Sequence, residues 1–462
     1  MREPGHGLPA GRCGGPVVRR ALLLGTALLA AGTLRAGQLS LSEAMRQAAR
    51  TSYPADAGRL EGARAQESTA QARSLYLPEV QFEGGHLSLD NQPQLRTAPI
   101  IFNGMNLGTT VNPLGDTSSW RYKVSVQYLV YDFGKRSKAL EASQYQEKAI
   151  GQGQAGAVRR AQAEVAARYV ALLNLKAQRR VLALRRTALE DHLKSVQDLF
   201  RQGVVARNDL LRTEVALRSL GDAERALDST EADAREALNV AMGLEPGAPL
   251  EVPAELGVPP ALAWSQAECR TRAAAANEQL QALRAKVQAL ASQAALRRSD
   301  YAPNVVTEAF HSYQQNSYAP NPNETGLLLG VSWKVFDGAR ASRVRQADTE
   351  LDLGRRGVQE TERQVGNAAA AAFRDYQVAL QEMQTSAANV AAAEENLRIV
   401  EDQYREGLAP GGDALDAEAL LADSRSGLDA RRYRAYAQQA ALLAVMGEDL
   451  PAFYEILNAK EQ

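Results

Sequence analysis

The sequence is poor in the residues that build catalytic and metal sites. Of its 462 residues only two are cysteines and four are histidines. Cys13 lies in the N-terminal segment, so Cys269 stands alone and the mature chain has no internal disulfide. The histidines are scattered, and no group of histidine, cysteine and carboxylate residues has the spacing of metal ligands. Phosphate-binding glycine loops and nucleophile elbows are also missing. We therefore predict no catalytic residue, no metal and no cofactor, and expect that the protein is not an enzyme.

Long apolar runs are missing too. The apolar segment 21–34 follows four arginines and is shorter than the roughly 20 residues that a membrane-spanning helix needs. Small residues at 30–32 and 34–36 offer cleavage points, so we interpret residues 1–36 as a cleaved export signal. The alternative is an uncleaved anchor. No later stretch is apolar for 18 residues, so a membrane contact would have to be made by strands.

Neither sign of charge is in large excess. The chain carries 53 basic and 54 acidic residues, and removal of residues 1–36 leaves 48 and 53, which is a net charge of −5. A protein that binds nucleic acid usually presents an excess of basic residues to the phosphates. The charge balance therefore argues against nucleic acid as a partner.

What the sequence does contain is an internal repeat. Residues 131–134 (Tyr-Asp-Phe-Gly) are matched by residues 336–338 (Phe-Asp-Gly), and the run 198–203 is matched by 402–407. A repeat of this length predicts a duplicated architecture rather than a row of short units. Three glycines have counterparts 204 positions later: Gly134 and Gly338, Gly203 and Gly407, Gly243 and Gly447. We divide the chain into the first repeat 37–243, a linker 244–262, the second repeat 263–450 and a C-terminal tail 451–462.

Each repeat is expected to hold a helix, a β-hairpin, a long helix and a returning helix. Tyr53-Pro54 should break the first helix, Gly84-Gly85 is interpreted as a bulge, and residues 90–118 as a long exposed loop. The long helices contain no proline, and their apolar heptads predict coiled-coil neighbours. The expected elements are helix 40–75, hairpin 76–132, long helix 135–202 and return helix 208–242, then helix 262–299, hairpin 301–337, long helix 339–406 and return helix 413–446.

The hairpins alternate between apolar and polar residues, which predicts strands with one apolar face. The opposite face, with Lys123, Gln127 and Lys334, would line water. A sheet in lipid needs closed edges, and membrane barrels start at about eight strands, so four strands per chain would require further chains. The alternative is a soluble sandwich. The expected lipid-facing residues are Tyr122, Val124, Val126, Tyr128, Leu329, Val331, Trp333 and Val335.

The sequence resembles the TolC-like outer-membrane efflux and secretion channels, the outer membrane factors. The duplicated plan, Leu77-Pro78 before the first strand, the strand ends Asp132–Gly134 and Asp337-Gly338, and the paired glycine turns carry this resemblance over essentially the whole mature chain. It implies a mainly α fold with a small β part. It also implies a homotrimer that shares a 12-stranded β-barrel in the outer membrane and a long α-helical barrel in the periplasm. The partners it implies are a periplasmic adaptor and an inner-membrane pump of the RND or ABC type.

The resemblance further implies site residues at the helix turns. Asp413 and Asp416 lie three residues apart on one helix face, and three copies would form acidic rings that favour cations in a pore. The alternative is an N-cap for Asp413 and a solvated Asp416. Where the family often has a bridging arginine this chain has Ala409, and Arg207 is a candidate substitute. The predicted pore constriction or gate is Asp413, Asp416, Tyr404, Asn208, Asp209 and Arg207. The predicted adaptor-contacting tips are Gly203, Val204, Val205, Gly407, Leu408 and Ala409, with helix C-caps as the alternative role of the two glycines.

We therefore expect the passive outer-membrane channel of a tripartite efflux or type I secretion system, gated at its periplasmic tip. The alternative is a periplasmic coiled-coil scaffold without a pore. The alternation of the strands and the aromatic residues beside them favour the channel. The sequence does not indicate the cargo, since the pump would mostly determine which compounds are exported.

Overall fold

The computed structural model describes residues 38–99, 101–203, 205–406 and 408–458. The chain divides into two units, Met1–Gln38 and Leu39–Gln462, and the description below concerns the second. The interpretation of residues 1–36 as an export signal falls outside the described residues and stays a prediction. Of the expected tips, Val204 and Gly407 also fall outside them.

The first repeat begins with two consecutive helices, α1 (Leu41–Thr51) and α2 (Tyr53–Ser74). Ser40 and Glu43 form a capping box at the start of α1, in which each side chain accepts from the backbone amide of the other residue. The two helices are separated at Ser52, and Pro54 stands in the first turn of α2, where it removes no helical hydrogen bond. This agrees with the break expected at Tyr53-Pro54. The second repeat has the same plan in α5 (Gln266–Ala276) and α6 (Glu278–Ser299), which are separated at Asn277.

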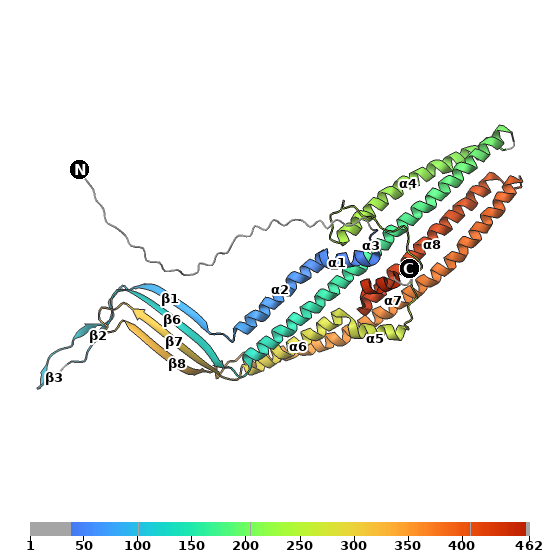
Figure 1. Ribbon diagram of the computed structural model, residues 1–462. Helices are drawn as coiled ribbons and strands as arrows, with labels where there is room; N and C mark the ends of the chain where they lie inside the picture. Colours follow the sequence, from blue (N-terminus) through green and yellow to red (C-terminus); the bar gives the residue numbers. More distant parts are fainter. Residues whose placement is uncertain (1–37, 100, 204, 407, 459–462) are drawn as a thin grey trace, which may run out of the picture. The chain divides into compact units, whose positions relative to one another are not determined.

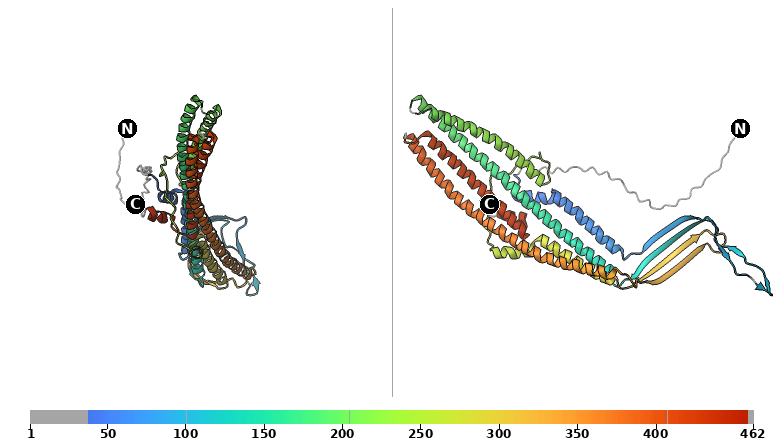
Figure 2. Two further views of the ribbon diagram at one scale, coloured as in Figure 1. Left: turned by 90° about the vertical axis from the view of Figure 1, so that its right-hand side faces the viewer. Right: turned by 180° about the vertical axis from the view of Figure 1, so that it is seen from behind.

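Two long helices, α3 (Lys135–Arg201) and α7 (Arg340–Arg405), carry the architecture of the repeats (Figure 1). Helix α3 packs along α2 and then along α4 (Arg207–Ala241). Helix α7 packs in the same way along α6 and then along α8 (Gly411–Met446), as Figure 2 shows from behind. The two sets meet where α3 touches α6 and α8. The mainly α, duplicated plan is therefore confirmed.

Four strands form one antiparallel sheet in the order β1 (Glu79–Ser88), β6 (Ser118–Tyr131), β7 (Asn304–Gln314) and β8 (Asn323–Ser332). The hairpins of the two repeats are joined by the pairing of β6 with β7. Strands β1 and β8 are therefore the two edges of the sheet.

The bulge expected at Gly84-Gly85 is wrong. Gly84 lies opposite Tyr122 and Gly85 opposite Arg121 without a shift in register. Gly84 instead leaves room for an aromatic ring, because a Cβ there would lie 3.2 Å from Cζ of Phe82, whereas nothing lies within 4 Å of the Cβ position of Gly85. The register shift of the sheet falls between Leu129 and Tyr131, where β6 pairs with β7.

One further expectation, the structureless loop 90–118, needs correction. The loop 90–118 contains the short strands β2 (Gln94–Arg96), β3 (Ile101–Phe102), β4 (Met105–Asn106) and β5 (Val111–Pro113), which pair as β2–β5 and β3–β4. Threonine side chains support this pairing, since Oγ1 of Thr97 lies 2.7 Å from Oγ1 of Thr110. The C-terminal tail contains helix α9 (Leu450–Asn458), and Leu450 and Tyr454 are buried.

The apolar core lies where α1, α5 and α9 cover the middle of the long helices. Large buried side chains meet there from both repeats, and the hydroxyl of Tyr376 donates to the carbonyl of Pro260 at 2.9 Å. The largest fully buried members are Met45, Tyr169, Leu172, Leu173, Leu238, Met242, Tyr376, Leu442, Leu443 and Met446. Among the helices of the described residues, none combines the length and the apolar character that crossing a bilayer requires.

Candidate functional site

The apolar face of the sheet is exposed. Six of the eight residues expected on it lie on strands, because Tyr122, Val124, Val126 and Tyr128 belong to β6, and Leu329 and Val331 to β8. Their large side chains remain open to solvent in the single chain. The expectation that Trp333 and Val335 belong to the same strand is wrong, because β8 ends at Ser332. Beyond it the amide of Val335 donates to the carbonyl of Trp333, which makes a tight turn.

Sequence reasoning missed other members of this face. Val80 and Phe82 of β1 lie opposite Val126 and Val124, and both are more than two-thirds exposed. Cross-strand partners share a face of the sheet, so the register adds them to it. Leu327 joins the face through its pairing with Ala309. The alternation at Val80 and Phe82 was a usable signal, whereas the run of leucines at 327–329 hides the alternation.

The opposite face of the sheet is polar and internally paired. The Nζ of Lys123 lies 2.6 Å from Oε1 of Glu308 on the neighbouring strand. The same Nζ lies 5.1 Å from the ring centre of Phe310. That ring lies over Gly326, where a Cβ would be 2.6 Å from it. Glycine is therefore required at this point so that Phe310 can lie flat beside the charged pair.

The two Asp-Gly strand ends cap the long helices. Asp132 accepts hydrogen bonds from the amides of Gly134 at 3.1 Å and Arg136 at 2.8 Å, which satisfies donors that a helix start leaves free. Arg136 returns an ion pair at 3.0 Å, with both side chains buried. The guanidinium also lies 4.8 Å from the ring centre of Tyr76. The sequence motif identified these positions, and the structure gives their role.

The second repeat reproduces this junction between sheet and helix. Asp337 accepts from the amide of Ala339 at 3.0 Å and pairs with Arg343 at 2.6 Å. Arg340, which stands 204 positions after Arg136, lies 5.0 Å from the ring centre of Tyr301. Each sheet-to-helix junction therefore combines a capping aspartate with an arginine on a tyrosine ring, and these arginines were not predicted.

The turn between α3 and α4 has the geometry of a helix C-cap. Gly203 has a φ of +76°, in the left-handed region that favours glycine, and its amide donates to the carbonyl of Phe200 at 3.0 Å. Val205 is half-buried. At the turn between α7 and α8, Leu408 is exposed and Ala409 half-buried. The tips therefore present apolar side chains at their turns.

Asp413 and Asp416 are both exposed on α8. The alternative role of Asp413 as an N-cap is wrong, because α8 begins at Gly411 after Pro410, which places Asp413 third in the helix. A carboxylate in the first turn is favoured by the helix dipole. Within the described part of the chain, neither aspartate side chain forms a hydrogen bond or an ion pair. Both carboxylates are therefore free to face a pore or solvent.

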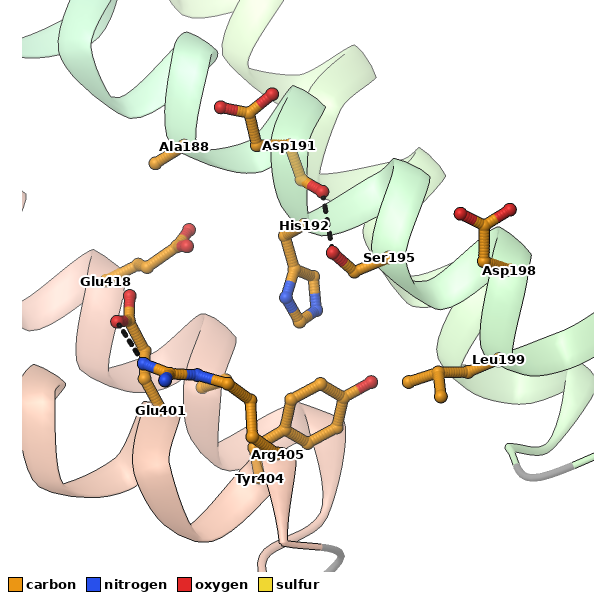
Figure 3. A pocket seen from close by; sticks show the side chains of 11 residues that line it. Ala188, Asp191, His192, Ser195, Asp198, Leu199, Glu401, Tyr404, Arg405 and Glu418 are labelled. Carbon is orange, nitrogen blue, oxygen red and sulfur yellow. Dashed lines mark hydrogen bonds and ion pairs between the residues drawn. The ribbon is translucent and has the colours of Figure 1, made fainter.

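The structure brings Tyr404, Asp209 and His192 together. A Cβ at Gly411 would lie 3.6 Å from the Tyr404 hydroxyl and 3.6 Å from the carboxyl carbon of Asp209. The rings of Tyr404 and His192 are 5.4 Å apart (Figure 3). Burial raises the pKa of Tyr404, and burial lowers the pKa of His192 against the opposing charge of Asp209. His192 was not predicted as part of this cluster.

The facing turns meet through Arg212 rather than Arg207. Arg207 and Asn208 are exposed. The Nη1 of Arg212 comes so close to Gly412 that a Cβ there would lie 2.9 Å from it. The pair Gly411-Gly412 at the start of α8 was the signal for this approach, because two adjacent glycines allow a neighbour to come near the backbone. Among the described residues Arg207 makes no ion pair, and its role as a substitute bridge stays a prediction.

No group of three or more histidine, cysteine or carboxylate residues in the described segments is arranged to hold a metal ion.

Known structures share the fold of this chain but little of its sequence. No curated protein sequence matches the chain. The crystal structure of the outer membrane protein VceC from Vibrio cholerae is similar, with 16% identity and a TM-score of 0.69, over 88% of this chain and 96% of VceC.

Other solved structures share the fold. CusC has 13% identity and a TM-score of 0.73, with 89% of this chain and 93% of CusC covered. The open state of the MtrE outer membrane channel from Neisseria gonorrhoeae has 15% identity and a TM-score of 0.69, with 89% of both chains covered. The model of the family described as outer membrane efflux protein matches residues 55–244 and 270–448. Because this match spans most of the sequence, the chain belongs to the outer membrane efflux protein family, whose members are passive channels and not enzymes.

Proposed function

We propose that this protein is the outer-membrane channel of a tripartite efflux or type I secretion system and works as a homotrimer. The observation that carries the proposal is the four-stranded sheet with an exposed apolar face and two open edges, β1 and β8. An open edge in hydrocarbon leaves backbone groups unpaired. Because the four strands are successively antiparallel, β8 of one copy meets β1 of the next in antiparallel orientation. Three copies then close a barrel of about 12 strands, within the range of membrane barrels.

The helices provide the second half of the channel. In the trimer, α3, α4, α7 and α8 of three copies form a tube through the periplasm, and their turns dock on a periplasmic adaptor. The apolar side chains of Val205 and Leu408 support this docking, because they give both turns an apolar surface for a partner. The adaptor connects the channel to an inner-membrane pump of the RND or ABC type.

Gating takes place at the helix turns. Tyr404, Asp209 and Gly411 hold the start of α8 against α4 and α7, while Asp413 and Asp416 stay exposed beside them. Three copies place six carboxylates around the entrance. Rings of carboxylates favour cations over anions in a pore, so the entrance selects cations.

Electron microscopy of the detergent-extracted mature protein tests the assembly. The expected particles have three-fold symmetry, with a barrel at one end of a helical tube. In planar bilayers the same protein is expected to conduct ions. A monomeric particle that leaves the membrane in high salt would contradict the proposal and favour a coiled-coil scaffold.

Ion selectivity tests the acidic entrance. The double substitution Asp413→Asn and Asp416→Asn is expected to lower the cation-to-anion permeability ratio in planar bilayers while the trimer still assembles, because both side chains are exposed and unpaired. Asp423→Asn, an exposed carboxylate farther along α8, is the matched control and leaves the ratio unchanged. An unchanged ratio in the double variant removes both residues from the pore.

A further inference from the structure

A groove lies between α3 and the α7–α8 pair, close to the turns that end the long helices (Figure 3). Its volume is about 590 Å³, within the range of small-molecule sites in proteins. Ala188 and Leu199 of α3 and Ala414 of α8 contribute apolar wall. Glu418 of α8 and Tyr404 of α7 contribute polar groups. The groove thus combines apolar surface with polar groups from three helices.

Glu418 is buried in this groove without a partner. Its side chain belongs to a residue that is only 8% exposed. Its Oε2 is buried and accepts no hydrogen bond within the described part of the chain. Figure 3 shows the carboxyl group directed from α8 across the groove toward α3. Burial of an ionised carboxyl without a compensating contact is strongly unfavourable, and a cation bound in the groove would supply that contact.

Other polar atoms around the groove are unpartnered as well. The Nε2 of His192, the hydroxyl of Tyr404 and the Nε of Arg185 are all buried and lack a hydrogen bond among the described residues. Buried polar atoms in native proteins nearly always have a partner. These atoms can therefore form hydrogen bonds with a group that enters the groove.

The charge of the lining determines the class of this partner. Four carboxylates line the groove, from Asp191, Asp198, Glu401 and Glu418, against a single arginine, Arg405. Most of these groups are already paired: Arg405 lies 3.2 Å from Asp402 and 3.8 Å from Glu401. Asp191 pairs with Lys194 at 3.0 Å, and Asp198 pairs with Arg201 at 2.9 Å. Glu418 is the lining carboxylate that has no ion pair among the described residues, with the positive charge of Arg185 nearby, so it supplies the negative charge that attracts a cation.

We propose that this groove binds a small organic cation, whose charge lies beside Glu418 and whose apolar groups pack on Ala188, Leu199 and Ala414. The ring of Tyr404 adds an aromatic surface, which attracts cations. A metal ion fits less well, because no described group of three ligand residues is arranged to hold one. The site lies within one chain, so it goes beyond the channel proposal and does not depend on the trimer.

The binding is expected to depend on pH. Burial, together with the nearby charge of Glu401, raises the pKa of Glu418 to about 7, against the lowering effect of Arg185. A cation prefers the ionised form of Glu418, so its affinity rises by about tenfold between pH 6 and pH 8. The remaining titratable or charged groups that line the groove are Asp191, His192 and Asp198 of α3, with the pKa of His192 lowered by burial, and Tyr404 and Arg405 of α7.

Equilibrium dialysis of the full-length protein in neutral detergent tests the site with tetraphenylphosphonium, an apolar cation. Tetraphenylborate, an anion of nearly the same shape, is the matched ligand control. The expected result is saturable binding of the cation that tightens from pH 6 to pH 8, without comparable binding of the anion. Glu418→Gln is expected to weaken the cation at pH 8 by at least about tenfold and to remove the pH dependence, while Asp423→Asn changes neither.

A second variant separates charge from shape. Ala188→Trp fills the groove without changing its charge, so it should also abolish binding, and circular dichroism checks that each variant keeps its helices. Equal affinity of wild type and Glu418→Gln for the cation overturns the proposal, and so does equal binding of cation and anion. The channel proposal is judged by conductance in bilayers, so either proposal can fail without the other.

Discussion

At the scale of single residues, both repeats contain the same packing contact between a glycine and a backbone segment. Gly243 and Gly447, which are 204 positions apart, both have a φ of +76° and both end a returning helix. Each glycine packs against the backbone where two consecutive helices are separated. Gly243 contacts Thr51 and Ser52, and Gly447 contacts Ala276. A Cβ at Gly447 would lie 2.6 Å from the carbonyl oxygen of Ala276. The glycines therefore serve the packing of each returning helix against the core.

Substitution of either glycine by alanine is expected to destabilise the protein. The new methyl group is unfavourable for two reasons. A positive φ costs an L-residue about 1–2 kcal/mol, and the methyl group would overlap with backbone that cannot rotate away. The thermal unfolding midpoint of Gly243→Ala and of Gly447→Ala should fall, and the double variant should fall further. Gly247→Ala is the control, because nothing lies within 4 Å of its Cβ position. Midpoints that all stay at the wild-type value would show that the backbone relaxes freely at these sites.

This contact also marks a limit of prediction from sequence. The paired glycines were visible as a repeat, but their partners were not, because a glycine that packs on a peptide group leaves no side-chain pattern in the facing segment. The facing residues even differ between the repeats. Thr51 donates to the carbonyl of Met242, and Asn277 to that of Val445. Different side chains thus donate an equivalent hydrogen bond to the end of the returning helix in the two repeats.

At the scale of elements, helix α8 contains a buried acidic residue within its apolar stripe. Ala414, Ala417, Leu421 and Ala422 are buried and follow helical spacing, and Glu418 falls in the same stripe. An acid at a buried position of a heptad was therefore a readable signal for the groove. The aspartates, by contrast, were selected through the resemblance alone, and the structure leaves their role as a prediction.

Glu418 is expected to make the stability of the protein depend on pH. The pKa of this carboxyl is about 7 in the folded chain against 4.5 for the reference value. Since the raised pKa means that the folded state holds the proton more tightly, the contribution is complete below pH 4.5, is lost as the pH rises to about 7, and is constant above it. The loss amounts to about 3 kcal/mol at most.

Comparison of wild type with Glu418→Gln isolates this contribution, because other titrating groups cancel in the difference. The variant should match wild type near pH 4.5 and have the higher unfolding midpoint at pH 8. Asp423→Asn is the control and should follow wild type at both values. A difference between Glu418→Gln and wild type that does not change with pH would show that Glu418 does not titrate in this range. The gain in stability at pH 8 also ensures that loss of cation binding in this variant cannot be attributed to unfolding.

The strands show why element ends are harder to predict than elements. The alternation of apolar residues runs on through Trp333 and Val335, but the strand stops at Ser332. The chain turns there because Asp337 must reach the amide of Ala339 at the start of α7. Local alternation carries no information on this constraint. The long helices were predicted within a few residues, since heptads and the lack of proline extend through their whole length.

At the scale of the whole molecule, the single chain is incomplete at the edges of its sheet. Strands β1 and β8 each have one neighbour among the described strands. The apolar face includes Phe82 and Leu327, which lie on these edge strands. Natural proteins protect exposed edges, because free edges lead to uncontrolled pairing. Pairing of β8 with β1 of another copy would give both edge strands a hydrogen-bonded neighbour.

Cysteine cross-linking tests this pairing. Cys269 is the only cysteine in the described residues and is buried, so Cys269→Ala gives a clean background. In that background Phe82→Cys is combined in turn with Leu327→Cys, Leu329→Cys or Val331→Cys, which samples the register of one face. One combination is expected to give a covalent trimer on mild oxidation, because only opposed residues come close enough for a disulfide. Val124→Cys with Leu329→Cys is the control, since β6 lies inside the sheet. Products that continue beyond three chains, or no product from any combination, would contradict a ring of three copies.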